Sequence, residues 1–440
     1  MLLAPLAVLG LPGCFGKFTE HFRQRGQLLS FISRIGWASV GMTLLLAGTI
    51  LAFPQQFAFW LFGDVDQTAL VQFLGAALVL VSASNFFGAL MESLCQVRTV
   101  TIMRFITGLA FAVIGVSLLM LWEDGASAAA TAYTISCFLG LIPAFWILWK
   151  YRTGIYNSGD PLTHAAMWRR IAPFAIWLWV SNLMNNLFEV SDRYMLIHWS
   201  SMESDLAQGA VGQYHSGRVV PLLLVSLAIM LGGLLMPYLS KFWESGEKAA
   251  VRIQLNWSVK LVSLSFTGAG VLTLLLSPVL FDWILQGRYN DGLAVFPMTL
   301  VYCIWYSIMV VAQDYLWVAE KGKWAAFSNA AALAVNILLN MLLIPLIGLH
   351  GAVIATSLGN LALLVLIFYL NHRFGCRTNI GIWLCAALPL VLLLSKPFAV
   401  IAFAAAVIAS LWSNLIFSSS EKLATWQLLK EKLGNLRPNN

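Results

Sequence analysis

The sequence predicts an all-α polytopic membrane protein. Of its 440 residues, 60% are hydrophobic and only 10% are charged, a balance that no soluble domain requires. The apolar residues form thirteen segments, most of them long enough to cross about 30 Å of hydrocarbon. The segments are 2–16, 36–61, 68–91, 99–122, 126–149, 171–199, 209–240, 256–285, 292–318, 324–347, 350–371, 380–395 and 397–418. The loops between them are too short to hold a soluble catalytic domain.

The distribution of basic residues predicts the topology. Of the 26 Lys and Arg residues, 22 fall in loops, helix ends or the tail on one predicted side, and two, Arg288 and Lys396, fall on the other. Because cytoplasmic loops are rich in Lys and Arg, we expect a multi-pass protein of the cell inner (cytoplasmic) membrane with a cytoplasmic C-terminus. Thirteen crossings then place the N-terminus outside. The net charge of +7 reflects these loops and does not indicate nucleic acid as a partner.

The chain matches itself at an offset of 224–225 residues. The collinear matches are Lys17-Phe18-x-Glu20 with Lys241-Phe242-x-Glu244, Pro54-x-x-Phe57 with Pro278-x-x-Phe281, Gly63 with Gly287, Arg98 with Lys323, and Ala130-Thr131 with Ala355-Thr356. Six predicted spans separate equivalent points, so the two copies have the same orientation. Parallel six-helix repeats imply two lobes with a substrate site between them.

This repeat predicts the domain organisation. We expect an N-terminal lobe of five helices at 1–150, a cytoplasmic linker at 151–170, a C-terminal lobe of six helices at 171–372, an additional two-helix hairpin at 380–418 and a cytoplasmic tail at 419–440. The counterpart of the helix at 171–199 would precede residue 1. The first lobe is therefore predicted to lack its first helix, either because the start of the chain is truncated or because the helix has been lost.

One predicted helix, at 175–199, carries an unusual polar face. Its sequence is AIWLWVSNLMNNLFEVSDRYMLIHW, and its polar residues are Asn182, Asn185, Asn186, Glu189, Asp192 and Arg193. At about 100° per residue these six side chains lie within an arc of roughly 120°. Charges are costly in lipid, so this face is predicted to line a cavity. The alternative is that it binds neighbouring helices, with Glu189 and Arg193 paired one turn apart.

Several stretches resemble one family. Gly10–Phe18 (GLPGCFGKF), Ser191–Leu196 (SDRYML), the segment beginning with VGQYHSGR at Val211, and Asn336–Asn360 (NILLNMLLIPLIGLHGAVIATSLGN) look like helices of bacterial polysaccharide flippases, in the same order. These flippases belong to the multidrug/oligosaccharidyl-lipid/polysaccharide exporter superfamily. The resemblance implies a transporter, not an enzyme. It implies that two lobes move an isoprenoid-diphosphate-linked oligosaccharide across the membrane by alternating access, the cargo being an O-antigen, capsule or exopolysaccharide repeat unit.

Such a cargo needs cations for its diphosphate and amide groups for its sugars. Arg218 and Arg193 are the two basic residues that the topology leaves within helices, and Arg suits phosphate because its planar head offers several donors. The alternatives are a structural ion pair for Arg218 with Glu189 or Asp192, and a salt bridge or snorkelling for Arg193. The candidate sugar ligands are the amides Asn182, Asn185, Asn186, Asn336 and Asn340, although Asn336 and Asn340 also suit hydrogen bonding between helices.

Three acids are candidates for coupling to an H⁺ or Na⁺ gradient: Glu189, Asp192 and Asp314. A half-buried carboxylate can exchange a proton or bind sodium, and the alternative for each is a neutralising pair. No GxxxxGK[ST] motif and no metal-ligand spacing is present, so no cofactor and no metal site is expected. The expected partners are the lipid-linked oligosaccharide, membrane lipids and the polysaccharide polymerase machinery.

Other classes remain as alternatives. A cation-coupled multidrug exporter of the same superfamily would be expected to have an acidic cavity with few arginines, and a lipid II flippase is an option within the flippase group. A membrane glycosyltransferase would use an acidic pair such as Asp64 and Asp66, but the loop that carries them is only a few residues long. A cleaved lipoprotein signal ending at Cys14 is disfavoured, because no basic residue precedes the apolar run.

Overall fold

The computed structural model describes residues 8–62, 66–122, 124–151, 159, 162–200, 204–287, 289–417 and 421–422. Over these ranges the regular structure is helical, and the all-α prediction is confirmed. By packing, the chain divides into two compact units. The first unit contains residues up to 183 together with 233–244, and the second contains 184–232 and the residues from 245 onward.

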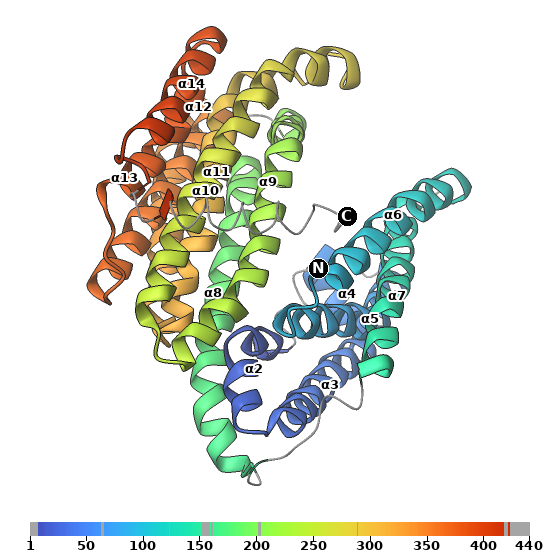
Figure 1. Ribbon diagram of the computed structural model, residues 1–440. Coiled ribbons are helices and arrows are strands. Elements are labelled where there is room, and N and C mark those ends of the chain that lie inside the picture. Colours follow the sequence, from blue (N-terminus) through green and yellow to red (C-terminus); the bar gives the residue numbers. More distant parts are fainter. Residues whose placement is uncertain are drawn as a thin grey trace, which may run out of the picture. The chain divides into compact units, whose positions relative to one another are not determined.

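The first unit is assembled around α5 (Thr68–Ser93). This helix packs against α2 (Cys14–Gln24), α3 (Leu28–Ala52), α4 (Pro54–Phe62), α6 (Val97–Leu121) and α7 (Gly125–Tyr151). Figure 1 shows α6 and α7 side by side along much of their length. The short 3₁₀ turn η1 (Leu11–Gly13) precedes α2, so the predicted segment 2–16 is described only in part.

The second unit is assembled around α11 (Asn290–Val318). α11 packs against α10 (Lys248–Leu275), α12 (Gly322–Arg373) and the 3₁₀ helix η4 (Leu388–Leu393). The π-helix η3 (Val279–Ile284) connects α10 to α11. At the C-terminal end of this unit, α13 (Ile380–Ala387) and α14 (Lys396–Trp412) flank η4 in the chain and both pack against α10 (Figure 1). In α11, 72% of the most apolar stretch is buried, a larger share than in the other long apolar helices of the described chain.

Two long helices contribute to both units. α8 (His164–His198) changes unit between Leu183 and Met184, and α9 (Ser204–Glu244) changes unit between Gly232 and Gly233. The polar face predicted for 175–199 lies on α8, and the residues from Met184 onward belong to the second unit. The domain boundaries expected from the repeat stay a prediction.

α12 is two helices separated by a break at Ile347 and Gly348. Gly348 has φ 54° and ψ −125°, a conformation that side chains with a Cβ avoid. Pro345 precedes the break and removes a helical hydrogen-bond donor. The two predicted spans 324–347 and 350–371 therefore correspond to the two arms of α12.

Eight helices among the described residues are long and apolar enough to cross a membrane. α8, the helix with the predicted polar face, is not one of them, and its crossing of the membrane stays a prediction. The predicted spans at 380–395 and 397–418 are shorter apolar helices, at Ile380–Leu393 and Lys396–Trp412.

Two charged residues that lie far apart in the sequence form a buried ion pair in the second unit. Lys260 was counted among the 22 basic residues of the predicted cytoplasmic side, but it lies inside α10 and is fully buried. Its Nζ contacts Oε1 and Oε2 of Glu421 at 2.9 and 2.8 Å. Glu421 is itself only 7% exposed, so both members of this ion pair are buried within the second unit.

Candidate functional site

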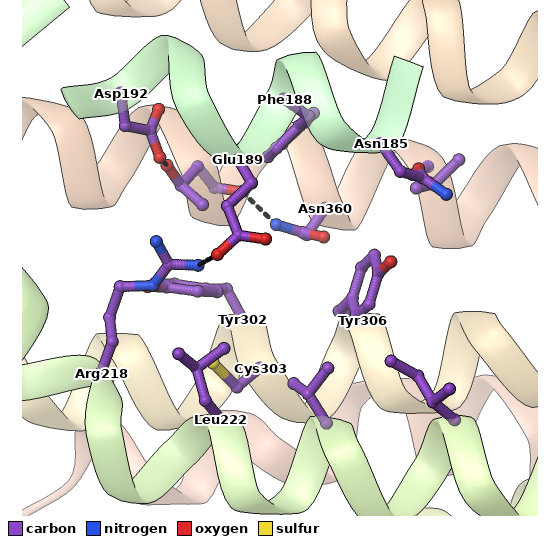
Figure 2. Close-up of a pocket in the computed structure, with 14 residues that line it drawn as sticks. Asn185, Phe188, Glu189, Asp192, Arg218, Leu222, Tyr302, Cys303, Tyr306 and Asn360 are labelled. Carbon is purple, nitrogen blue, oxygen red and sulfur yellow. Dashed lines mark hydrogen bonds and ion pairs between the residues drawn. The ribbon is translucent and has the colours of Figure 1, made fainter. Parts of the chain in front are cut away.

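The second unit contains a pocket of about 130 Å³ between α8, α9, α11 and α12 (Figure 2). Its lining residues are Asn185, Phe188, Glu189, Asp192, Arg218, Leu222, Val225, Ile229, Tyr302, Cys303, Tyr306, Thr356, Asn360 and Leu363. Arg218 and Glu189 meet at one end, and Asn185 and Tyr306 lie toward the other (Figure 2). The pocket thus combines one cation, two acids, amides and phenols on a largely apolar wall.

Arg218 is the cation of this pocket, and most of its hydrogen-bonding capacity is unused. Only 6% of the residue is exposed. Its guanidinium carbon lies 5.0 Å from the ring centroid of Tyr214, and Nη2 lies 3.7 Å from Oε1 of Glu189, which is too long for a hydrogen bond. Nε and Nη1 are buried and have no hydrogen-bond partner among the described residues. Buried donors are costly to leave unmet, so the three N–H groups on these two nitrogens favour an anionic partner.

Asp192 lines the same pocket, but its hydrogen-bonding capacity is used, in contrast to that of Arg218. It is 1% exposed, and its two carboxylate oxygens accept four hydrogen bonds. The donors are Asn336 Nδ2 at 3.0 Å and Asn340 Nδ2 at 2.8 Å to Oδ1, and Tyr214 OH at 2.7 Å and Thr356 Oγ1 at 2.5 Å to Oδ2. The donors come from α9 and from both arms of α12. Together these four neutral donors solvate the buried carboxylate.

The two α12 asparagines are part of this network. Asn336 and Asn340 are both fully buried, and Asn336 Oδ1 accepts from Ser191 Oγ at 2.8 Å and from Asn340 Nδ2 at 3.2 Å. The alternative expectation, hydrogen bonding between helices, is what the structure has for this pair. A role for them in binding sugars stays a prediction.

The remaining candidates on α8 are divided. Asn185 lines the pocket, whereas Asn182 and Asn186 do not. Arg193 pairs with Glu189 at 3.3 Å, as the spacing of one turn predicted, and it is also outside the lining. Glu189 therefore has two arginine neighbours and remains 50% exposed. A substrate-binding role for these residues stays a prediction.

Asp314 lies elsewhere in the second unit, on α11. It is 8% exposed, and its Oδ2 has no hydrogen-bond partner among the described residues. The Cβ of any residue replacing Gly232 would lie 3.5 Å from this oxygen. Asp314 is thus buried beside Gly232 of α9, which is also buried, and it does not line the pocket that holds Asp192.

Four important side chains of the site were not identified from the sequence: Tyr214, Tyr302, Tyr306 and Thr356. Tyr214 precedes Arg218 by four residues, so the helical repeat alone places the two on one face of α9. Thr356 is one of the residues that match across the internal repeat. Tyr302 and Tyr306 are also four residues apart, but they lie in a continuous apolar stretch where nothing distinguishes them from core aromatics.

The site offers mostly neutral oxygen and nitrogen groups for binding ions. Among the described residues, no group of three or more His, Cys, Asp or Glu side chains is arranged to hold a metal ion. Around Asp192 the additional oxygen ligands are hydroxyls and carboxamides, and Asn340 Oδ1 is buried without a partner.

Comparison with known families identifies the class of this protein. The family model described as polysaccharide biosynthesis protein matches residues 1–243, more than half of the chain, and the chain belongs to this family. It is accordingly a transporter of the multidrug/oligosaccharidyl-lipid/polysaccharide exporter superfamily and a multi-pass membrane protein, and the resemblance read from the sequence is confirmed.

Individual relatives agree with this assignment. The chain is 25% identical over 371 residues to the uncharacterized membrane protein YabM of Bacillus subtilis, covering 80% of this chain and 68% of that protein. Its fold is similar to that of a MATE transporter in the straight conformation, with TM-score 0.69, 12% identity and coverage of 86% and 85% of the two chains. A MOP superfamily transporter from Pyrococcus furiosus gives TM-score 0.67, 12% identity and the same coverage.

Proposed function

We propose that this protein is a flippase for an isoprenoid-diphosphate-linked oligosaccharide in the bacterial cytoplasmic membrane. The observation that supports the proposal most is the buried guanidinium of Arg218, which has two unmet donors and lies at the end of a pocket in the second unit. The family provides the class of process, polysaccharide biosynthesis. A cytoplasmic C-terminus is part of the proposal, and a reporter enzyme fused after Asn440 should be active only on the cytoplasmic side.

The chemistry of the cargo matches the pocket. A diphosphate carries several acceptor oxygens, so separate oxygens can accept hydrogen bonds from Nε and from Nη1 of Arg218, whose N–H groups point to different sides of the planar guanidinium. Glu189 lies only 3.7 Å from Nη2 and is half-exposed, so it can move aside when a stronger anion enters. Asn185 and Asn360 supply carboxamides for the sugar hydroxyls, and Tyr306 supplies an aromatic face.

Asp192 is the best candidate for coupling to an ion gradient. Four donors stabilise the charged carboxylate, and turning the Asn340 side chain would exchange a donor for an acceptor, as binding of a cation requires. The proposed coupling ion is a proton or Na⁺. Glu189 is paired with arginines and Asp314 lies outside the pocket, so both rank below Asp192.

A genetic test uses a bacterial strain whose own flippase gene is deleted. The wild-type chain should restore surface polysaccharide, and Arg218→Gln should lower it by at least about tenfold, because charged hydrogen bonds to the diphosphate are lost. Arg373→Gln is the matched control, since Arg373 is an exposed arginine of the same unit outside the pocket. Failure to restore any of several repeat units, or equal activity of Arg218→Gln, would contradict the proposal.

A second candidate function is a cation-coupled multidrug exporter. The observation in its favour is the fold, which is similar to that of a multidrug resistance MATE family transporter at TM-score 0.66, 13% identity and 86% coverage of both chains. A drug exporter should protect a sensitive strain against cationic dyes and should depend on Glu189 more than on Arg218. A flippase should show the reverse dependence.

A further inference from the structure

Tyr214 is a completely buried residue of α9 that contacts two of the three charged residues of the pocket in the second unit, Asp192 and Arg218. Its hydroxyl donates to Asp192 Oδ2 at 2.7 Å. Its ring lies beneath Arg218, with the guanidinium carbon 5.0 Å from the ring centroid. One rigid side chain therefore connects the carboxylate proposed for the cation to the guanidinium proposed for the diphosphate.

We propose that Tyr214 is a positioning residue that couples cation binding at Asp192 to anion binding at Arg218. This inference rests on the proposed function, because it assumes that both sites are used. While Asp192 is an anion, its hydrogen bond holds the phenol in place and makes the ring more electron-rich, which strengthens the attraction for the guanidinium. A guanidinium held on the ring is less available to a diphosphate.

Neutralising Asp192 with a proton or Na⁺ weakens the bond from the Tyr214 hydroxyl. The phenol is then free to turn, and Nε and Nη1 of Arg218 become easier to direct toward a ligand. Cation and diphosphate should therefore each strengthen the binding of the other, since a coupling free energy is reciprocal. Thr356 serves as the control for Tyr214 within the same pocket. Its hydroxyl also donates to Asp192 Oδ2, but Thr356 has no aromatic ring that could face Arg218.

Other charged or titratable groups near this pair must be separated from Asp192 in any test of pH dependence. They are Glu189 and Arg193 on α8, His215 and Arg218 on α9, and Tyr302 and Cys303 on α11. The groups that α12 presents to Asp192 are neutral carboxamide and hydroxyl groups. His215 is the one whose ordinary titration overlaps neutral pH, so the His215→Gln background serves for the proton measurements.

The test measures the affinity of the purified full-length chain for farnesyl diphosphate in detergent. One arm replaces choline by Na⁺ at fixed pH, and the other varies pH without Na⁺ in the His215→Gln background. For the wild type, the cation that neutralises Asp192, whether Na⁺ or H⁺, should raise the affinity for farnesyl diphosphate about tenfold. In Tyr214→Phe, which keeps the ring but lacks the hydroxyl, the change should shrink to about twofold or less. Thr356→Val should shift the cation concentration required but keep the full change.

The outcomes separate the two proposals. A wild-type affinity that is independent of both cations, or an unchanged cation effect in Tyr214→Phe, overturns the coupling role of Tyr214 while the anion site stands. Binding of farnesyl diphosphate that does not depend on Arg218 overturns the proposed function itself. Each variant is also checked for a single cooperative unfolding transition by tryptophan fluorescence. Tyr214→Met replaces Tyr214→Phe if the latter does not fold, because methionine is smaller than tyrosine, adapts to a buried space and has no donor for Asp192.

Discussion

Two buried cations of the second unit differ in how they are satisfied. Lys260 is fully buried, and both oxygens of Glu421 lie within 2.9 Å of its Nζ. Arg218 is nearly as buried, but its closest carboxylate lies 3.7 Å away and two of its nitrogens have no partner. The first cation has a partner for its charge, and the second has donors left over.

This difference distinguishes a structural charge from a functional one. Removing one partner of a buried ion pair with close contacts destabilises the fold, because the other charge then stays buried without compensation. A buried cation with unmet donors is a cost to the folded protein that binding of an anion removes. The two residues should therefore respond to the same substitution in opposite ways.

The largest effect is expected at the structural pair. Lys260→Met leaves Glu421 buried without its cation and should cost about 3–5 kcal/mol of stability. Thermal unfolding in detergent, followed by tryptophan fluorescence, should show a Tm several degrees lower. The double variant Lys260→Met with Glu421→Leu should recover most of the loss, and a double variant as unstable as the single one would show that the pair is not the cause.

At Arg218 the same substitution should have the opposite sign. Arg218→Met removes two unmet donors and keeps an unbranched side chain of similar length, so Tm should stay level or rise by the equivalent of up to about 2 kcal/mol. Thermal unfolding in detergent measures this change, and the same variant should lose its binding of farnesyl diphosphate. A fall in Tm as large as that of Lys260→Met would mean that Arg218 is a structural residue.

Glu189 tests whether its carboxylate competes with the ligand for Arg218. Glu189→Gln removes the negative charge 3.7 Å from the guanidinium and should strengthen diphosphate binding. Because half of Glu189 is exposed and solvent screens the pair, a gain of only about threefold is expected. The affinity for farnesyl diphosphate measures this, and weaker binding in Glu189→Gln would assign the carboxylate to the ligand site itself.

The smallest change in Tm is expected at Asp124, an exposed carboxylate whose hydrogen-bond donors come from nearby residues of the chain. The Ser127 side chain and the backbone N–H groups of Ala126 and Ser127 donate to its carboxylate at the start of α7 and hold its pKa below the ordinary 3.8. The stabilisation is therefore present above pH 3.8 and is lost as the pH falls through the lowered pKa. Asp124→Ala should lower Tm by about 1–2 °C at pH 7 and by less at pH 3. An equal change at both values would exclude the charged form as the cause.

Much of the fold follows from the sequence because lipid imposes a simple rule on each span. Hydropathy predicted the helical class and the break within α12, where Pro345 and Gly348 interrupt a long apolar run. The count of basic residues on each side of the membrane failed for Lys260, because a lysine is assigned to the cytoplasmic side unless a buried partner for it is known. That partner, Glu421, is 161 residues away in a mixed-charge tail, and sequence separation of this size carries no local signal.

The candidate site was predictable only where polar or charged residues interrupt apolar helices. Arg218, Glu189, Asp192 and Asn185 were identified because polar residues are conspicuous in apolar helices, and the pocket of the second unit contains all four. Tyr214 and Thr356 were not identified, because an aromatic ring and a hydroxyl are ordinary inside a membrane helix. Their importance comes from their contacts with Asp192, which only the packing of α9 and α12 on α8 creates.

The central claim is that Arg218 binds the diphosphate of a lipid-linked cargo. The most direct measurement compares the affinities of the wild type and Arg218→Gln for farnesyl diphosphate and for farnesol, which has the same chain without phosphates. The wild type should prefer farnesyl diphosphate by at least about tenfold, and Arg218→Gln should lose that preference while its affinity for farnesol stays the same. Equal affinities of the wild type for both ligands, or a preference that persists in Arg218→Gln, would contradict the claim.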